Sequence, residues 1–438
     1  MELSVLRAER RPGITRSRPD AERAARVRCG RRCIAVLVAA VALASRAAHA
    51  QVLQTVTDGV GGVDGLAGVK HIAISPDGAH LYAAADTDSA VSVFAIGPTG
   101  LLTFVQALKD DWVGGPSDGL RNARYLQVSP DGANVYVAAY NEFATASFSR
   151  NPATGALALV NEVPNPPCCS AFTSINEVVV SPDGEHVYTV SNGYAVALAR
   201  GFGGSISLID QYDLIDDTFG RGFAVAVSPD GAHLYIAHDI YLEAVTRQSG
   251  GALAFAAQYE DGIGGIDGLN GVESIAISPD GFDVYAGSVN DHAVTHFTRS
   301  PATGQLSFQT AYVDLSQCAH VNELLMLADG SGLVASCLEH VAFYERDPAT
   351  GALSLSASIP QESIGASQIY SAAVSGGVLY LASNQTNSIV VLPAPAAAPA
   401  VPDLTAAAWL IGFAGIAGVA ISNLGAHSRR RPGSRATA

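Results

Sequence analysis

The sequence predicts an all-β fold, a seven-bladed β-propeller of four-stranded antiparallel blades, on three observations. The turn Ser-Pro-Asp-Gly recurs about every 50 residues, and two degenerate copies extend the series to seven starts: Ser75, Ser129, Ser181, Ser228, Ser278, Leu327 and Ser375. This period is typical of propeller blades rather than helical solenoids. Short apolar segments flank each turn. With 44 Gly and only 15% charged residues, the chain suits many tight turns between buried strands.

Each repeat unit shows the same order of elements. A short apolar strand precedes the turn, as in residues 72–74, and Pro and Gly then form the turn itself. A second strand follows and usually carries a Tyr, such as Tyr82. A third strand ends at a Gly-containing hairpin, as in residues 151–155, and a fourth strand such as 306–308 completes the unit. We expect no helix between residues 51 and 393.

The two ends of the repeat region predict how the ring closes. The seventh unit ends after its third strand, residues 389–392, whereas residues 52–56 form a lone strand. The Gly-rich segment that follows the lone strand, residues 58–66, nearly repeats residues 261–269, which follow a fourth strand. We therefore expect the N-terminal strand to complete the seventh blade, which leaves the ring without a free edge.

The N-terminal segment, residues 1–50, predicts export. It contains eleven Arg residues, an apolar run at 33–44 and the sequence Ala48-His49-Ala50. This order is typical of a secretory signal peptide, with Gln51 as the mature start. An uncleaved anchor is the alternative.

The C-terminal segment predicts a membrane anchor. A Pro/Ala-rich linker at 394–403 precedes an apolar stretch at 404–424, long enough to span a bilayer as a helix, and a basic tail at 425–438. The Arg cluster of that tail favours a cytoplasmic end, with the propeller outside. This order resembles the C-terminal sorting tails of bacterial surface proteins, and a permanent tail anchor is the alternative. Both place the propeller at the cell surface or in the cell envelope.

The charge of the body restricts its partners. Residues 51–403 contain ten basic and 36 acidic residues, a net charge of −26. A body this acidic repels phosphate backbones, so no nucleic-acid partner is expected. It is also repelled by an anionic membrane surface, so membrane contact is expected only through the C-terminal helix.

The repeat pattern resembles one known family. The strand-Ser-Pro-Asp-Gly-x-x-Val/Leu-Tyr unit and the Arg-x-Pro-x-Thr-Gly hairpins, such as residues 150–155, resemble the lactonase-type seven-bladed propellers, which include bacterial 6-phosphogluconolactonase. The resemblance covers residues 51–393. It implies hydrolysis of a sugar-acid lactone, although many relatives look like binding scaffolds. No catalytic motif of the family is carried over residue by residue.

A ring of variable residues predicts a site at one mouth of the central channel. Five residues before each turn stand Lys70, Arg124, Asn176, Phe223, Glu273, Asn322 and Tyr370. Four residues before it stand His71, Tyr125, Glu177, Ala224, Ser274, Glu323 and Ser371. Deeper positions are mostly apolar. A purely structural ring would repeat more closely from blade to blade, so this variation favours a ligand site.

The basic residues of the body indicate which ligand the site would bind. Five of them repeat at the same hairpin position, which indicates a structural role: Arg150, Arg200, Arg247, Arg299 and Arg346. Four others lie close before the turns: Lys70, Arg121, Arg124 and Arg221. We expect these four, with Asn176, Asn322 and Tyr370, to bind an anion such as a carboxylate. The alternative is that they pair with loop acids such as Asp64, Asp111 and Asp118.

Carboxylates and histidines near the same mouth are candidate general bases. Glu177, Glu273 or Glu323, with His71 or His340 close by, would activate water for attack on a lactone. His238 and His292 also fall near second-strand ends. Each of these histidines can instead be a satisfied structural residue. A His/Glu metal site is conceivable on composition, but no metal is predicted there.

Two further features involve acidic loops and cysteines. The Gly-rich loops carry Asp58 and Asp64 in one copy and Asp261 and Asp267 in the other, which allows calcium as the one cofactor; plain Gly-rich turns are the alternative. Cys318 and Cys337 flank one hairpin and are expected to form a disulfide. Adjacent Cys168 and Cys169 could form a vicinal disulfide.

These observations support two functions from different classes. The first is an exported, surface-anchored scaffold that binds an extracellular protein, a matrix or a small anionic ligand. The alternative is a lactonase-like hydrolase that acts on an anionic lactone at the channel mouth. A mouth without a cavity would favour the scaffold over the enzyme.

Overall fold

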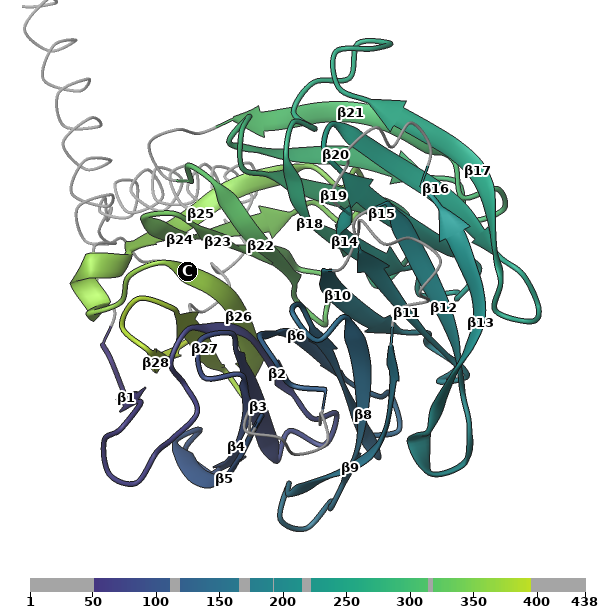
Figure 1. The fold of residues 1–438 in the computed structure, drawn as a ribbon. Helices are drawn as coiled ribbons and strands as arrows, with labels where there is room; N and C mark the ends of the chain where they lie inside the picture. Colours follow the sequence, from purple (N-terminus) through teal and green to yellow (C-terminus); the bar gives the residue numbers. More distant parts are fainter. Residues whose placement is uncertain are drawn as a thin grey trace, which may run out of the picture. The chain divides into compact units, whose positions relative to one another are not determined.

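The computed structural model describes residues 51–110, 119–164, 174–191, 193–214, 222–313 and 318–394. Within these ranges the chain forms seven four-stranded antiparallel sheets arranged as the blades of a ring (Figure 1). The predicted signal peptide, most of the linker, the apolar C-terminal stretch, the basic tail, Arg221, Cys168 and Cys169 lie outside the described residues. In the part of the chain that is described, no helix has the length and apolar character needed to cross a membrane.

The strands follow one another from the channel outward in blades 1 to 3. Blade 1 contains β2 (Val69–Ile74), β3 (His80–Ala85), β4 (Ala90–Ile96) and β5 (Leu102–Lys109). Blade 2 contains β6 (Ala123–Val128), β7 (Asn134–Ala139), β8 (Ala144–Arg150) and β9 (Leu157–Pro164). Blade 3 contains β10 (Ile175–Val180), β11 (His186–Ser191), β12 (Tyr194–Arg200) and β13 (Ile206–Asp213).

Blades 4 to 6 repeat this order. Blade 4 contains β14 (Gly222–Val227), β15 (His233–His238), β16 (Tyr241–Arg247) and β17 (Leu253–Glu260). Blade 5 contains β18 (Val272–Ile277), β19 (Asp283–Ser288), β20 (Ala293–Arg299) and β21 (Leu306–Val313). Blade 6 contains β22 (Val321–Met326), β23 (Gly332–Cys337), β24 (His340–Arg346) and β25 (Leu353–Pro360). Two short 3₁₀ helices, Phe202–Gly204 and Gln361–Ile364, were not predicted.

Blade 7 closes the ring as the sequence predicts. It contains β26 (Ile369–Ser375), β27 (Val378–Ser383) and β28 (Ser388–Pro393), and its outer strand is β1 (Gln54–Thr57) from the N-terminus. β1 pairs antiparallel with β28, with Val56 opposite Ile389. The strand begins two residues later than predicted. The first strand of each blade contacts the first strands of its neighbours, so these seven strands surround the channel.

Hydrogen bonds inside the Ser-Pro-Asp-Gly turn explain why this tetrapeptide recurs. In blade 1, Ser75 Oγ donates to Asp77 Oδ1 at 2.5 Å, and the amide of His80 donates back to Ser75 Oγ at 3.0 Å. Gly78 adopts φ +69°, which a residue with a Cβ rarely does. The turn therefore satisfies its own polar groups while it reverses the chain.

The repeated Arg and Tyr residues join neighbouring blades in an arrangement that we call the inter-blade clamp. Arg150, at the end of β8, donates to the Tyr82 hydroxyl at 2.8 Å and to Asp77 Oδ2 at 2.7 Å, both in blade 1. The same guanidinium donates to the carbonyl of Gly132 in its own blade. Tyr82 then donates to the carbonyl of Gly155 in blade 2. These contacts explain the structural repetition of the five arginines.

The clamp recurs at five of the seven blade interfaces in the described residues. Its other arginines are Arg200, Arg247, Arg299 and Arg346, each bonded to a Tyr and an Asp of the preceding blade. Between blades 6 and 7 the Tyr position holds Val334. Between blades 7 and 1, Tyr380 still donates to the carbonyl of Gly100, but Ile96 stands where the other blades have Arg. Blade 7 therefore lacks the ionic part of the clamp on both sides.

Candidate active site

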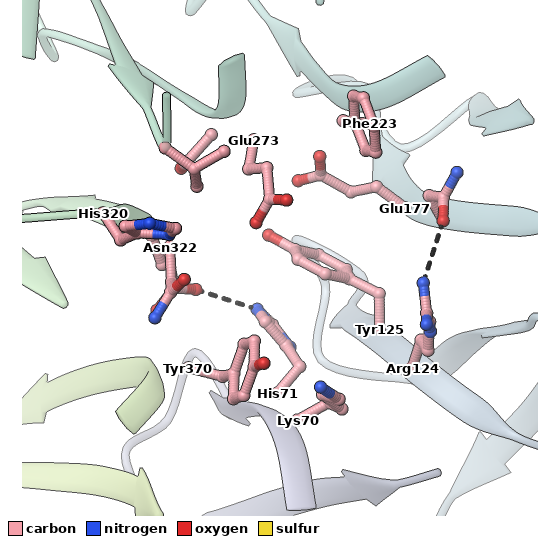
Figure 2. Close-up of a pocket in the computed structure, with 14 residues that line it drawn as sticks. Lys70, His71, Arg124, Tyr125, Glu177, Phe223, Glu273, His320, Asn322 and Tyr370 are labelled. Carbon is pink, nitrogen blue, oxygen red and sulfur yellow. Dashed lines mark hydrogen bonds and ion pairs between the residues drawn. The ribbon is translucent and has the colours of Figure 1, made fainter. Parts of the chain in front are cut away.

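A cavity of about 400 Å³ lies at one mouth of the channel, a size typical of small-molecule sites. All seven residues that stand five positions before the turns line it, with five of the seven that stand four positions before. The remaining two lining residues are Val289 and His320. The structure therefore brings most of the predicted ring together around one space (Figure 2).

A β-bulge in the first strand of every blade explains how two consecutive side chains reach this cavity. In a regular strand successive side chains point to opposite faces, so only one of the two would face the channel. In blade 1 the register shifts between Val69 and His71, with Lys70 as the extra residue. The same shift occurs at the same place in the other six blades. The bulge redirects side chains locally and recurs because the blades are equivalent.

Several of the ring residues also hold the neighbouring blade. Oε2 of Glu177 accepts the amide of Val225 at 2.9 Å, and Oε2 of Glu323 accepts the amide of Ala372 at 2.6 Å. Ser274 and Ser371 accept the corresponding amides in the blades that follow them. The two glutamates therefore have a structural role that the sequence did not reveal, and each uses one carboxyl oxygen for it.

His71 is held in place at the cavity wall. Its Nε2 lies 3.2 Å from Glu323 Oε1, and its ring stacks on Tyr125 with 3.6 Å between ring centroids. Ser371 Oγ also donates to Glu323 Oε1 at 3.2 Å, which fixes the carboxylate. The Nδ1 atom of His71 is buried and has no hydrogen-bond partner. Buried polar atoms without a partner are uncommon and are often found in functional sites.

Glu177 is a carboxyl group that favours its protonated form. Burial raises its pKa to about 8, and the negative charge of Glu323 adds to the rise. Hydrogen bonds from Tyr125 and from the amide of Val225 oppose the shift without cancelling it. The pKa of Tyr125 lies well above its usual value because of burial and the charges of Glu177 and Glu323, so this hydroxyl stays neutral.

Glu273 differs from the other two glutamates of the cavity. Its carboxylate forms no hydrogen bond or ion pair with another described residue. Burial raises its pKa, whereas the positive charges of Lys70 and Arg124 lower it. Figure 2 shows the carboxyl groups of Glu273 and Glu177 directed toward the middle of the ring from different blades. Glu273 is therefore the glutamate of the cavity that is least committed to structure.

Two of the four predicted cations line the cavity. Lys70 Nζ lies 3.5 Å from the centroid of the Tyr370 ring and 3.8 Å from Asp86 Oδ2. Arg124 donates to Asn176 Oδ1 at 3.2 Å, and its guanidinium carbon lies 3.9 Å above the Tyr140 ring. Its Nε is buried without a hydrogen-bond partner. Lys70 therefore lies near a loop acid, Asp86, whereas Asp64 pairs with Lys109. No carboxylate among the described residues forms an ion pair with Arg124, and Asp111 and Asp118 lie outside those residues.

Other predicted site residues lie elsewhere. The side chain of Arg121 is not part of the cavity lining, and Arg221 lies outside the described residues. His340, at the start of β24, is also absent from the lining. His292 Nδ1 accepts the amide of His320 at 3.0 Å. His238 pairs with buried Glu243 at 2.9 Å, which is a structural contact.

His320 is the cavity residue that the sequence analysis missed. It lies seven positions before its turn, where blades 1 and 5 have the glycines Gly68 and Gly271. All three residues have φ between +55° and +73°, a region that a residue with a Cβ rarely occupies. Asn122 and Gln368 occupy the same position with a positive φ in blades 2 and 7, so this backbone conformation belongs to the repeat and gives no signal specific to His320.

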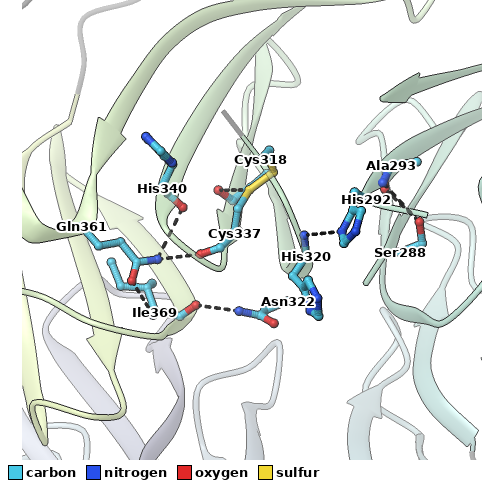
Figure 3. Close-up of a disulfide and its surroundings, with 11 residues drawn as sticks. Ser288, His292, Ala293, Cys318, His320, Asn322, Cys337, His340, Gln361 and Ile369 are labelled. Carbon is cyan, nitrogen blue, oxygen red and sulfur yellow. Dashed lines mark hydrogen bonds between the residues drawn. A yellow bond between two sulfur atoms is a disulfide. The ribbon is translucent and has the colours of Figure 1, made fainter. Parts of the chain in front are cut away.

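The predicted disulfide between Cys318 and Cys337 is confirmed and lies beside His320 (Figure 3). It joins Cys318, which precedes β22, to the last residue of β23, with 5.0 Å between the Cα atoms. The carbonyl of Cys337 accepts a hydrogen bond from Gln361 Nε2 at 2.6 Å. Gln361 Oε1 in turn accepts the amide of Ile369 at the start of β26. These contacts connect blade 6 to blade 7, where the clamp is missing.

The two Gly-rich loops form similar acidic clusters with different surroundings. Asp58 and Asp64 lie with Asp88, and Asp261 and Asp267 lie with Asp291, their ligand atoms within 4.8 Å of one another in each cluster. Lys109 Nζ contacts Asp64 at 2.6 Å and Asp88 at 3.2 Å, so an ammonium group already neutralises part of the first cluster. Calcium at either loop stays a prediction.

Comparison with known proteins supports the fold and the family resemblance. The family described as "Lactonase, 7-bladed beta-propeller" matches residues 35–172. No curated protein matches the chain. A candidate 6-phosphogluconolactonase from Bacteroides uniformis is 19% identical, with a TM-score of 0.57 over 69% of this chain and 88% of that one. The periplasmic gluconolactonase of Pseudomonas aeruginosa is 17% identical, with a TM-score of 0.56 over 66% of this chain and 85% of that one.

The same architecture also occurs in a protein with another function. Hydrazine synthase of Kuenenia stuttgartiensis is 17% identical, with a TM-score of 0.58 over 78% of this chain and 99% of that one. At such identities the structural likeness establishes the fold and not the reaction. The seven blades and the closing N-terminal strand identify the chain as a seven-bladed β-propeller, and residues 35–172 are similar to the lactonase family of such propellers.

Proposed function

We propose that the protein is a hydrolase that opens an anionic lactone in the cavity at the channel mouth. The observation that carries this proposal is the composition of the cavity lining. Lys70 and Arg124 supply positive charge on one side, and Glu273 supplies a carboxylate without a hydrogen-bond partner among the described residues on another. Binding groups for an anion and a base for water therefore share one space of ligand size.

The roles follow from the chemistry of the groups. Arg124 and Lys70 would hold the carboxylate of the substrate, because a guanidinium and an ammonium form strong charge-assisted hydrogen bonds to carboxylates. Glu273 would remove a proton from water as the oxygen attacks the lactone carbonyl. Burial raises the pKa of Glu273, which makes its carboxylate a stronger base, and the charges of Lys70 and Arg124 partly oppose this rise by favouring the ionised form. The stacked His71 and Tyr125 rings would form an apolar wall for the sugar ring.

Two solved structures with this fold support a lactone as the substrate. One is described as a candidate 6-phosphogluconolactonase and the other as a gluconolactonase. The scaffold function would have been favoured by a mouth without a cavity, and the cavity of about 400 Å³ removes that argument. The lactonase-like hydrolase is therefore the better supported of the two functions.

The test is hydrolysis of a panel of lactones, with and without a carboxylate, by the purified full chain. We expect turnover of carboxylated lactones. Arg124→Ala should raise KM by about 10-fold or more, the value of a hydrogen bond to a charged group. Glu273→Gln should lower kcat by about 10²–10⁴-fold. Glu185→Gln, an exposed carboxylate at the far end of blade 3, is the matched control. Absence of turnover, or turnover indifferent to both substitutions, would contradict the proposal.

The binding scaffold is the second candidate function. Phe202, at the tip of a hairpin, is fully exposed, and Phe282, next to a turn, is 56% exposed. Exposed aromatic side chains are common in protein contacts. Binding of an extracellular protein or matrix that is lost in Phe202→Ser, with no lactone turnover by the wild type, would favour this function.

We further propose that the protein acts outside the cytoplasm, held by its C-terminal segment. Residues 1–50 have the composition of a signal peptide, and residues 404–424 are apolar enough for a membrane-spanning helix. A disulfide within the propeller is compatible with an oxidising compartment. Cell fractionation and N-terminal sequencing test this, with a membrane or envelope fraction and a mature start at Gln51 as the expected result. A cytoplasmic product that retains residues 1–50 would contradict it.

A further inference from the structure

We propose that Glu177 is the general acid of the lactone hydrolysis and gives its proton to the leaving ring oxygen, while Glu273 acts as the base. This inference rests on the proposed hydrolase function and assigns one of its two proton transfers. It separates the roles of two carboxyl groups that line the same cavity.

The geometry of Glu177 suits a proton donor. Oε2 is occupied by the hydrogen bond from the amide of Val225 in blade 4. The proton of the neutral carboxyl is therefore carried by Oε1. Glu177 is 9% exposed, and Figure 2 shows its carboxyl group directed into the cavity. The carboxyl group is thus held by the Val225 amide and by the Tyr125 hydroxyl while it faces the cavity.

The surroundings keep that proton in place at neutral pH. The titratable groups that act on Glu177 are Tyr125 from β6 and Glu323 from across the cavity, and Glu273 is directed into the same space from β18. Tyr125 stays neutral, and Glu323 is negatively charged and disfavours a second charge beside it. The positive charges of Lys70 and Arg124 act on Glu273, where they oppose the rise of its pKa. Two carboxyl groups whose environments differ in this way are suited to opposite roles.

The proposed hydrolysis begins with the attack of water. Glu273 accepts a proton from water while the water oxygen forms a bond to the lactone carbonyl carbon, and the carbonyl oxygen takes the negative charge. The bond between that carbon and the ring oxygen then breaks as the carbonyl re-forms. The ring oxygen takes the proton of Glu177 and becomes a hydroxyl. The product is a hydroxy acid, and proton transfer from Glu273 to Glu177 through solvent restores both groups.

The test compares Glu177→Gln with the Glu185→Gln control on two carboxylated lactones of similar size. One lactone has an aliphatic ring oxygen and the other a phenolic ring oxygen. An alkoxide needs a proton to leave and a phenoxide does not. We expect Glu177→Gln to lower kcat about 10²-fold or more on the aliphatic lactone and only a few-fold on the phenolic one. The side-chain oxygen of the substituted residue can still accept the Val225 amide, so the fold should persist.

The pH profile gives a second readout that a purely structural role would not move. In the wild type, kcat on the aliphatic lactone should fall above pH 8 as Glu177 loses its proton, because its pKa is about 8. Glu177→Gln should lack this basic limb. Equal losses on the two lactones, or a basic limb that persists in the variant, would overturn the assignment of Glu177 while leaving the hydrolase function intact. A wild type that hydrolyses no lactone would overturn both.

Discussion

At the residue scale, Glu243 shows how this protein keeps a carboxylate in its interior. Its side chain is fully buried in blade 4. It lies 2.9 Å from His238 Nε2 and accepts the Tyr212 hydroxyl of blade 3 at 2.8 Å. Burial and the neighbouring Glu243 raise the pKa of Tyr212, so the hydroxyl remains a donor. The cavity glutamates follow the same rule, since Glu177 and Glu323 also accept hydrogen bonds from the next blade.

We predict that Glu243→Ala destabilises the propeller by about 3–5 kcal/mol, because it removes the partner of a buried His and leaves the Tyr212 hydroxyl without this acceptor. The measurement is chemical denaturation of the full chain at neutral pH. Glu362→Ala, at an exposed position of the 3₁₀ helix, is the control and should change stability by less than about 0.5 kcal/mol. A loss at Glu243 no larger than that of the control would show that the buried network contributes nothing.

At the element scale, the inter-blade clamp couples the hairpins of one blade to the turn of the blade before it. Asp131 and Asp183 are clamp carboxylates with a pKa of about 2. Burial alone would raise these pKa values, but the turn Ser hydroxyl, a backbone amide and the clamp Arg lower them. The ionised carboxylate is therefore stabilised by folding, relative to its usual pKa of about 3.9 in an unfolded chain.

This shift predicts a pH dependence of stability with a definite sign. A carboxylate whose pKa is lowered by folding contributes stability that is fully present above about pH 4 and is lost as the pH falls toward about 2. The stability difference between the wild type and Asp131→Asn should therefore shrink between about pH 4 and pH 2. Denaturation curves of the two proteins across this range provide the measurement. Curves that stay parallel would contradict a clamp role for the Asp131 charge.

At the scale of the whole molecule, blade 7 differs from the other blades in how it is joined to its neighbours within the described residues. It lacks the clamp Arg on both sides, and its outer strand, β1, is only four residues long. The contacts of Gln361 and the disulfide of blade 6 replace part of what is missing. The two ends of the chain thus meet in the blade that has no clamp arginine on either side, and hydrogen bonds such as those between Gln54 and Leu102 join it to blade 1 instead.

We predict that blade 7 opens more readily than the other blades. Amide hydrogen exchange should be faster in β27 than in β19, the equivalent strand of blade 5, which is held by a clamp on both sides. An element opens less often the larger the free energy that holds it in place, so its amides exchange more slowly. Native-state exchange followed by mass spectrometry measures this directly. Equal protection of the two strands would show that the clamp adds no local stability.

The number of blades, the closure by the N-terminal strand, the disulfide and most of the residues around the cavity can be predicted from the sequence alone. These features follow from turn chemistry and a regular period, which act over short stretches of chain. Ser-Pro-Asp-Gly forms the same turn in each blade. Lys70 and Glu273 both stand five residues before such a turn, so they lie at the same mouth of the channel.

Contacts between blades, which the sequence does not reveal, set which of these residues are available for chemistry. Glu177 and Glu323 accept hydrogen bonds from amides of the following blade, about 50 residues away. Glu273 has no such donor among the described residues. The bulge that aims Lys70 and His71 into one cavity, and the place of His320 in its wall, also depend on how strands of different units pack. A repeat in one dimension specifies each blade, but contacts between blades arise only when the ring is assembled.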